Sequence, residues 1–252
     1  MSVAEPALVV VAVLAVWELL ARIGVLPSSI PAPGSIVSSL ASDMQTSRLW
    51  NGVLDSVGAW AIGLGIVVVV GVPVGVLLGS SRVLYAATRH TVEFLRMIPS
   101  IAALPLLVFV YGVGFQLTVV LVVLTALWPL LLQSMYGVHD VDPVARDTAR
   151  VYGLGRGRVF ARVTMPSVAP YVATGLRLSG TIALVVAIAT SLVVGGSGLG
   201  ALIASASNSG QNPLMYGRIL LAGILGLILT GALIAAERRL LHWHPSQRQA
   251  SS

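Results

Sequence analysis

The sequence lacks cysteine and lysine altogether and has few charged residues of any kind. Of its 252 residues, 10% are charged and 56% are hydrophobic, and the mean hydropathy is +0.93. An ordinary soluble domain has roughly 25% charged residues, so a soluble globule of this composition would expose large apolar patches to water. The absence of cysteine excludes a disulfide framework and thiolate metal sites. The composition therefore predicts a membrane protein.

The missing lysine also excludes ATP hydrolysis by a phosphate-binding loop, because the pattern G-x-x-x-x-G-K-[ST] needs that residue. Any dependence on ATP must then come from a partner. No pairing of a nucleophile with a base, and no metal-ligand pattern, occurs within the apolar stretches, which disfavours a membrane-embedded enzyme. We expect a protein that is not an enzyme and holds no cofactor.

Six apolar stretches are long enough to cross a bilayer, which takes about 20 helical residues. They cover residues 7–23, 57–79, 92–112, 117–136, 172–194 and 216–236. The first follows an acid and a proline instead of a basic region, so we interpret it as a retained span and not as a signal peptide. The third contains Pro99 and Pro105 and also fits a shorter or broken span. We predict an all-α membrane protein with six transmembrane helices in a single domain, residues 1–252.

The positions of the basic residues predict the orientation, because arginine and lysine concentrate in cytoplasmic loops. Three alternate segments carry eleven basic residues, namely Arg82, Arg89, His90, Arg146, Arg150, Arg156, Arg158, Arg162, Arg238, Arg239 and Arg248. The intervening segments carry only Arg48, although Arg22 at the end of the first span opposes the pattern. Both termini are therefore expected in the cytoplasm. We interpret the net charge of +6 as this orientation signal and expect no nucleic-acid partner.

Polar and small residues near the spans allow three further expectations. The stretch IVSSLASDM, within residues 24–56, predicts an amphipathic helix at the outer face. Glu93 and Arg96 stand at i and i+3 and can pair on one helix face, whereas most other ionisable residues, Arg218 among them, lie near span ends and can snorkel. Three glycines repeat every four residues, at positions 71, 75 and 79, and indicate either packing within the chain or a dimer contact or substrate path.

The segment 137–171 is basic and too long for a tight turn. Its core reads DTARVYGLGRGRVFARVTMPSVAP from Asp147, which predicts a short helix, a turn at Gly153 and a second helix that ends before Pro166. Five apolar residues have no span to bury them, namely Val151, Tyr152, Leu154, Val159 and Phe160. The segment is thus either a docking element for another protein or a helix that lies on anionic lipid headgroups.

This segment resembles the loop signature of inner-membrane permease subunits of ABC importers, which is E-A-A, three residues, G, nine residues and I-x-L-P. The matching positions are Asp147, Thr148, Ala149, Gly153, Val163, Met165 and Pro166. Thr148 departs from the alanine of the signature. The resemblance implies that residues 137–171 form a cytoplasmic coupling loop, which fits a cleft on a separate ATP-binding subunit.

The resemblance extends over nearly the whole chain and is strongest to the nitrate, sulfonate and taurine permease branch. The supporting stretches are WE at 17–18, LPSSIPAPGSI, LRMIPSIAALPLLVFVYGVG, WPLLLQSMYGVHDVDP, TGLRLS, GSGLG and ERRLLHW. It implies a type I (MetI-like) permease in the cytoplasmic membrane of a bacterial cell. It also implies two ABC ATPase subunits, a second permease copy or a homologous permease, and an extracytoplasmic substrate-binding protein.

The resemblance does not identify a single transported solute. The branch usually has glutamate where this sequence has Ser191. This departure weakens the inference, drawn from the branch, that nitrate or sulfonate is the cargo. We therefore expect a small polar solute: a sulfonate, taurine or nitrate-like anion, or a related metabolite such as a pyrimidine precursor. Candidates for the translocation path are Ser134, Thr181 and Ser191. The alternative is an ion-coupled secondary carrier or channel, whose transport would survive the removal of ATP.

Overall fold

The computed structural model describes residues 4–240, and every regular element in that range is helical. The elements are α1 (Ala4–Arg22), α2 (Pro33–Asp43), α3 (Ser47–Gly79), α4 (Arg82–Met97), the 3₁₀ turn η1 (Ser100–Ala103), α5 (Leu104–Tyr111), α6 (Phe115–His139), α7 (Pro143–Val151), α8 (Arg156–Val159), the π-helical turn η2 (Phe160–Thr164), α9 (Met165–Val194), α10 (Leu199–Asn208) and α11 (Asn212–Leu240). Arg248, one of the residues used for the orientation, lies outside the described range.

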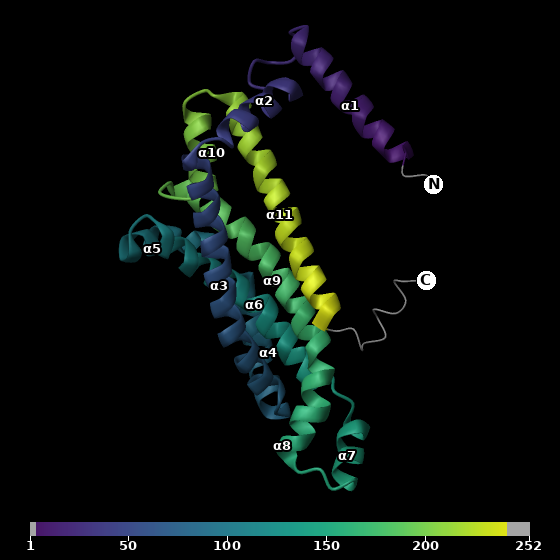
Figure 1. The fold of residues 1–252 in the computed structure, drawn as a ribbon. Helices are drawn as coiled ribbons and strands as arrows, with labels where there is room; N and C mark the ends of the chain where they lie inside the picture. The colour runs from purple at the N-terminus through teal and green to yellow at the C-terminus, as the bar shows by residue number, and fades with distance from the viewer. Residues whose placement is uncertain (1–3, 241–252) are drawn as a thin grey trace.

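Helices α3, α6 and α9 form the centre of a long bundle, with α11 alongside (Figure 1). Their contact is made by small and branched apolar side chains, such as Val67, Val122 and Ala183, which are fully buried. Gly75 lets α3 and α6 approach closely, because an added Cβ would overlap the carbonyl oxygen of Leu131. Packing within the chain, one of the two interpretations of the glycine repeat, is therefore confirmed.

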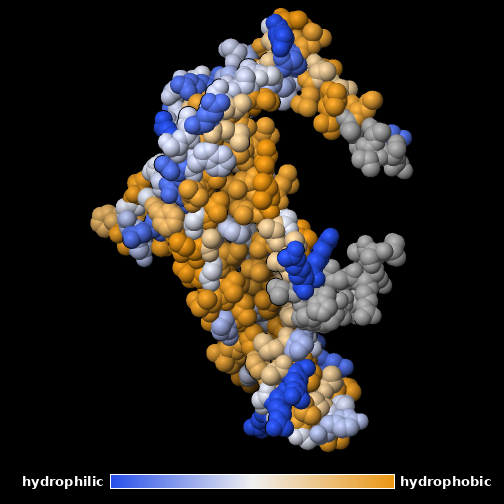
Figure 2. Space-filling view, viewed as in Figure 1, coloured by the Kyte–Doolittle hydropathy of each residue, from blue (hydrophilic) through white to orange (hydrophobic). Residues whose placement is uncertain are grey.

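The apolar helices confirm a multi-pass membrane protein. Four helical segments are long and apolar enough to span a bilayer, Ser47–Gly79, Phe115–His139, Arg156–Asn208 and Asn212–Arg239, and the pair Arg82–Met97 and Ser100–Tyr111 makes a fifth if counted as one span. Apolar side chains cover the middle of the bundle, and hydrophilic residues gather at its two ends (Figure 2). The total of six stays a prediction, since the sixth span would be α1, which extends away from the bundle (Figure 1).

The third predicted span is broken. α4 and the segment Ser100–Tyr111 meet at an angle of 69°. Pro99 lies at this break, where its fixed φ and missing N–H stop the helix. Within α4, the expected pair of Glu93 with Arg96 is wrong. Glu93 accepts hydrogen bonds from Arg89 Nε at 3.1 Å and from the Tyr136 hydroxyl at 2.8 Å, because α4 packs on α6 along that face.

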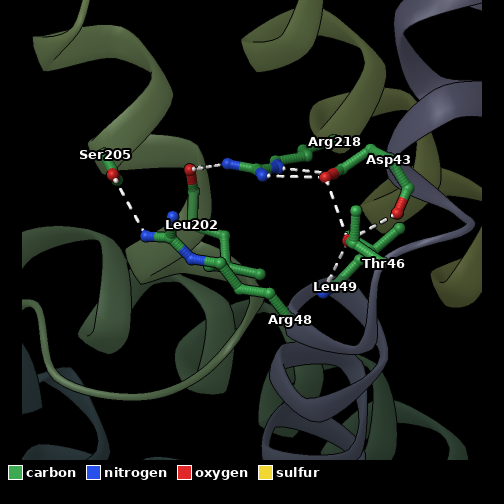
Figure 3. Close-up of polar contacts among 7 residues, drawn as sticks. All are labelled: Asp43, Thr46, Arg48, Leu49, Leu202, Ser205 and Arg218. Atoms are coloured by element: carbon green, nitrogen blue, oxygen red, sulfur yellow. Dashed lines mark hydrogen bonds and ion pairs between the residues drawn. The ribbon is translucent and has the colours of Figure 1, made fainter.

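At the end of the bundle formed by α2 and α10, hereafter the α10 end, polar side chains form a buried network (Figure 3). The expected amphipathic helix is α2, and its last residue, Asp43, is only 8% exposed. Arg218 on α11 is 4% exposed and contacts both carboxylate oxygens of Asp43, at 2.8 and 3.1 Å. Arg218 also donates to the Leu202 carbonyl at 2.6 Å. The expectation that Arg218 snorkels is therefore wrong, because its partners hold it inside the protein.

Candidate functional site

The segment 137–171 folds into a helical hairpin at the opposite end of the bundle, hereafter the α7 end (Figure 1). α7 begins at Pro143, whose missing N–H costs nothing in a first turn. The preceding Asp142 caps the helix by accepting a hydrogen bond from the Val144 backbone N–H at 2.8 Å. Arg146 then donates from Nη2 to the Val138 carbonyl at 2.6 Å. This bond joins the middle of α7 to the last turn of α6.

Gly153 ends α7 in a Schellman motif. Its φ is +80°, a left-handed conformation that side chains with a Cβ rarely adopt. The Gly153 N–H bonds to the Arg150 carbonyl at 2.9 Å and the Leu154 N–H bonds to the Ala149 carbonyl at 3.1 Å, which is the paired pattern of this motif. No atom lies within 4 Å of an added Cβ, so backbone conformation and not space explains the glycine.

The second half of the hairpin differs from the expected helix that ends before Pro166. α8, the π-helical turn η2 and α9 follow one another without interruption, and Pro166 lies in the first turn of α9. The wider π-helical turn before it leaves room for the ring. The hairpin therefore continues as a helix directly into the bundle.

The hairpin brings the two parts of the predicted signature to one end of the molecule, since α7 packs against α8 and η2. Asp147 and Thr148 are exposed and Ala149 is half-buried. Asp147 pairs with Arg150 at 3.0 Å, and both side chains face solvent. Of the second part, Val163 and Met165 are half-buried and Pro166 is exposed.

Large apolar side chains are exposed at the tip of the hairpin. Val151 is 86% exposed and Tyr152 is 80% exposed. Of the five apolar residues expected to lack burial, Val159 is buried in the bundle and Leu154 is half-buried. This difference could not be predicted from the sequence, because burial of Val159 depends on how α8 packs. An exposed apolar tip flanked by arginines has the composition of a protein-docking surface.

The three candidates for the translocation path do not come together. Ser134 is fully buried and donates to the Leu130 carbonyl at 2.7 Å, and Thr181 is exposed and donates to the Arg177 carbonyl at 3.0 Å. Ser191 is buried where α10 meets α9, and a Cβ added to Gly198 would lie 3.1 Å from its hydroxyl. Position 191 thus holds a small side chain that packs closely against Gly198. Of the three candidates, only Thr181 lies on the surface of the chain in this conformation.

The described residues offer no site for a bound metal. Within residues 4–240, no three histidine or acidic side chains gather closely enough to hold an ion.

Comparisons with known proteins agree with this architecture. Residues 71–242 match the family described as binding-protein-dependent transport system inner membrane component. The nitrate import permease protein NrtB of Synechocystis sp. is 28% identical, over 90% of this chain and 86% of the relative. The taurine transport system permease protein TauC of Escherichia coli is 27% identical, over 92% of this chain and 86% of the relative. A structure titled as an inward-facing conformation of the MetNI methionine ABC transporter has a TM-score of 0.67 at 21% identity, over 78% of this chain and 98% of that one.

Proposed function

Because the chain belongs to the family of binding-protein-dependent transport system inner membrane components, we propose that it is the permease subunit of an ATP-driven ABC importer. ATP hydrolysis takes place on separate subunits, since the chain has no lysine and hence no phosphate-binding loop. The single observation that carries the proposal is the hairpin of residues 137–171, with its exposed tip and its Gly153 turn at the spacing of the coupling signature. The permease domain comprises residues 1–252, with this coupling loop inside it.

The hairpin is built to transmit movement. α8, η2 and α9 are continuous from the loop into the bundle, and the bond from Arg146 to Val138 joins α7 to α6. α6 and α9 pack along their length around fully buried residues such as Ala126 and Ala183. A displacement of α7 by an ATPase subunit therefore reaches two central helices together, as a rigid-body shift between inward-facing and outward-facing states requires.

The proposed assembly has two ABC ATPase subunits at the coupling loops, a second permease copy or a homologous permease, and an extracytoplasmic binding protein. The chain lies in the bacterial cytoplasmic membrane with both termini in the cytoplasm, as the arginine distribution favours. Its cargo is a small polar solute: a sulfonate, taurine or nitrate-like anion, or a related metabolite such as a pyrimidine precursor. The two relatives named above, a nitrate import permease protein and a taurine transport system permease protein, support this class.

A matched pair of glycine substitutions tests the coupling role. Gly153 and Gly157 both have open space around an added Cβ, but only Gly153 has a positive φ. Gly153→Ala should cost about 1–2 kcal/mol of local strain and displace the tip, whereas Gly157→Ala should preserve the loop. We expect Gly153→Ala alone to reduce co-purification of the ATPase subunits and their stimulated hydrolysis. If the two variants retain ATPase co-purification and stimulated hydrolysis equally, the coupling assignment is wrong.

Reconstitution separates the importer from the ion-coupled carrier or channel. The assembly is placed in vesicles with the binding protein and cargo on the outside, and ATP is either enclosed or omitted. The importer accumulates cargo only with enclosed ATP. Transport that persists without ATP and responds to an ion gradient would favour the carrier.

A further inference from the structure

A cavity of about 570 Å³ lies at the α7 end, between the start of α4, the end of α6 and α7. Arg82, His139, Arg146 and Arg150 line it, and we call these four residues and their cavity the basic pocket. Its size is within the range of small-ligand sites, roughly 300–1,000 Å³. A smaller cavity of about 150 Å³ shares Arg146 and Arg150 with it.

The basic pocket carries an excess of positive charge. The only acid that lines it is Asp147, which already pairs with Arg150. Two other acids close in sequence point elsewhere: Asp142 caps α7, and Asp140 accepts a hydrogen bond from the Tyr171 hydroxyl at 3.3 Å. Within residues 4–240, the side chain of Arg82 has no hydrogen-bond or ion-pair partner. The pocket thus has three guanidinium groups and one carboxylate, which pairs with only one of them.

The pocket is also preorganised. The His139 ring stacks on Tyr85, with centroids 3.8 Å apart and planes inclined by 2°. Arg146 is fixed by its bond to the Val138 carbonyl, yet its Nε is buried with no hydrogen-bond partner in the described part of the chain. α4 begins at the pocket and has no acid at its N-cap or in its first turn. The partial positive charge of its N-terminus adds to that of the arginines, whereas the N-terminus of α7 is already capped by Asp142.

We propose that the basic pocket binds a phosphate-bearing anion. Guanidinium groups match the geometry of phosphate oxygens, and a helix N-terminus such as that of α4 favours such anions. The cavity is larger than one acidic side chain needs and has room for a headgroup. Two sources share this chemistry, the headgroup of an anionic phospholipid and free phosphate. The headgroup is within reach because the apolar run of α3 ends at Gly79, on the wall of the pocket.

A bound anion would join α4 to α7 of the coupling loop. Arg82 belongs to α4 and Arg146 and Arg150 belong to α7, so a phosphate between them replaces repulsion by a bridge. An effect of this bridge on coupling rests on the proposed function, in which α7 binds the ATPase subunit. The binding itself does not depend on that role.

The test measures binding to the purified full-length permease without ATPase subunits. Short-chain phosphatidylglycerol, short-chain phosphatidylcholine and inorganic phosphate are titrated separately, and binding is followed by native mass spectrometry and thermal shift. We expect phosphatidylglycerol to bind in preference to phosphatidylcholine. Arg82→Gln should weaken that binding about five-fold, the effect of roughly one surface arginine. Arg96→Gln is the matched control, because Arg96 is also exposed on α4 but does not line the pocket.

The outcomes separate the sources. Phosphatidylglycerol binding that inorganic phosphate does not displace supports a lipid headgroup, and displacement by inorganic phosphate, again sensitive to Arg82→Gln, supports a free phosphate. Equal losses in Arg82→Gln and Arg96→Gln, or no loss in either, would overturn the site. Unchanged anion binding together with reduced ATPase co-purification in Arg82→Gln would also overturn it, by assigning the pocket to an acidic side chain of the partner. Absence of anion binding to the unsubstituted permease would overturn the proposal too, and the glycine test of the coupling loop does not depend on that result.

Discussion

The two ends of the bundle use arginine in opposite ways. At the α10 end, Arg218 is buried, contacts both oxygens of Asp43 and donates to the Leu202 carbonyl (Figure 3). At the α7 end, Arg150 is exposed and its one acidic partner, Asp147, is exposed as well. The same residue type therefore closes one end internally and leaves the other available to an external partner.

This difference has a physical basis. Moving a charge out of water is expensive, and a buried ion pair persists only where geometry and further hydrogen bonds satisfy it. Arg218 meets that condition, with three partner atoms on two other helices. An exposed pair keeps its hydration and contributes little stability. The α10 end should therefore resist perturbation, whereas changes at the α7 end should alter partner binding and leave the fold intact.

Arg218→Met should have the largest effect on stability. It leaves the Asp43 carboxylate buried without its cation, which typically costs about 3–5 kcal/mol. We expect a marked fall in the midpoint of thermal unfolding in detergent. Arg48→Met is the control, because Arg48 is exposed in the same region and makes only a 3.5 Å contact to Ser205.

A double substitution tests whether the unpaired charge causes that fall. Asp43→Asn in the Arg218→Met background removes the charge and should recover part of the stability. If Arg218→Met and Arg48→Met lower the midpoint equally, the α10 end is not held by its buried pair and the contrast between the ends is lost.

Ser56→Ala should have an intermediate effect. The Ser56 hydroxyl accepts a hydrogen bond at 2.9 Å from the Leu199 backbone N–H, and this bond is buried where α10 begins. Removal of the acceptor leaves a buried donor unsatisfied, at a cost of about 1–3 kcal/mol. Thermal unfolding should show a clear loss for Ser56→Ala and almost none for Ser38→Ala, whose exposed hydroxyl bonds only within α2. Similar midpoints for both would show that α10 does not depend on this bond.

The sequence predicted the helical class and the long apolar spans, because a bilayer imposes length and hydropathy directly. It did not predict the pair of Arg218 with Asp43, whose members are 175 residues apart. A lone arginine near the end of a span looks the same in sequence whether it snorkels or is buried. The pairing depends on how α2 folds over α10 and α11, which periodicity does not reveal.

The coupling loop was predictable in part. The Gly153 turn followed from a residue type and its spacing, since a left-handed C′ position selects glycine. The prediction that the second helix ends before Pro166 was wrong, because a proline preceded by a π-helical turn is compatible with a continuous helix. The basic pocket has no linear signature, since its residues come from three helices.

Substitution of the exposed pair at the α7 end should have the smallest effect on stability. Asp147→Asn and Arg150→Gln both break an ion pair that contributes at most about 1 kcal/mol, so each should shift the unfolding midpoint by no more than about 4 °C. Co-purification of the ATPase subunits should nevertheless fall for Asp147→Asn, because Asp147 stands at the acidic position of the coupling signature. A loss of stability as large as that of Arg218→Met would contradict the contrast, since it would mean that the α7 end is held by this pair. Unchanged stability with reduced association instead places its role in partner binding, which is what an end left open to solvent implies.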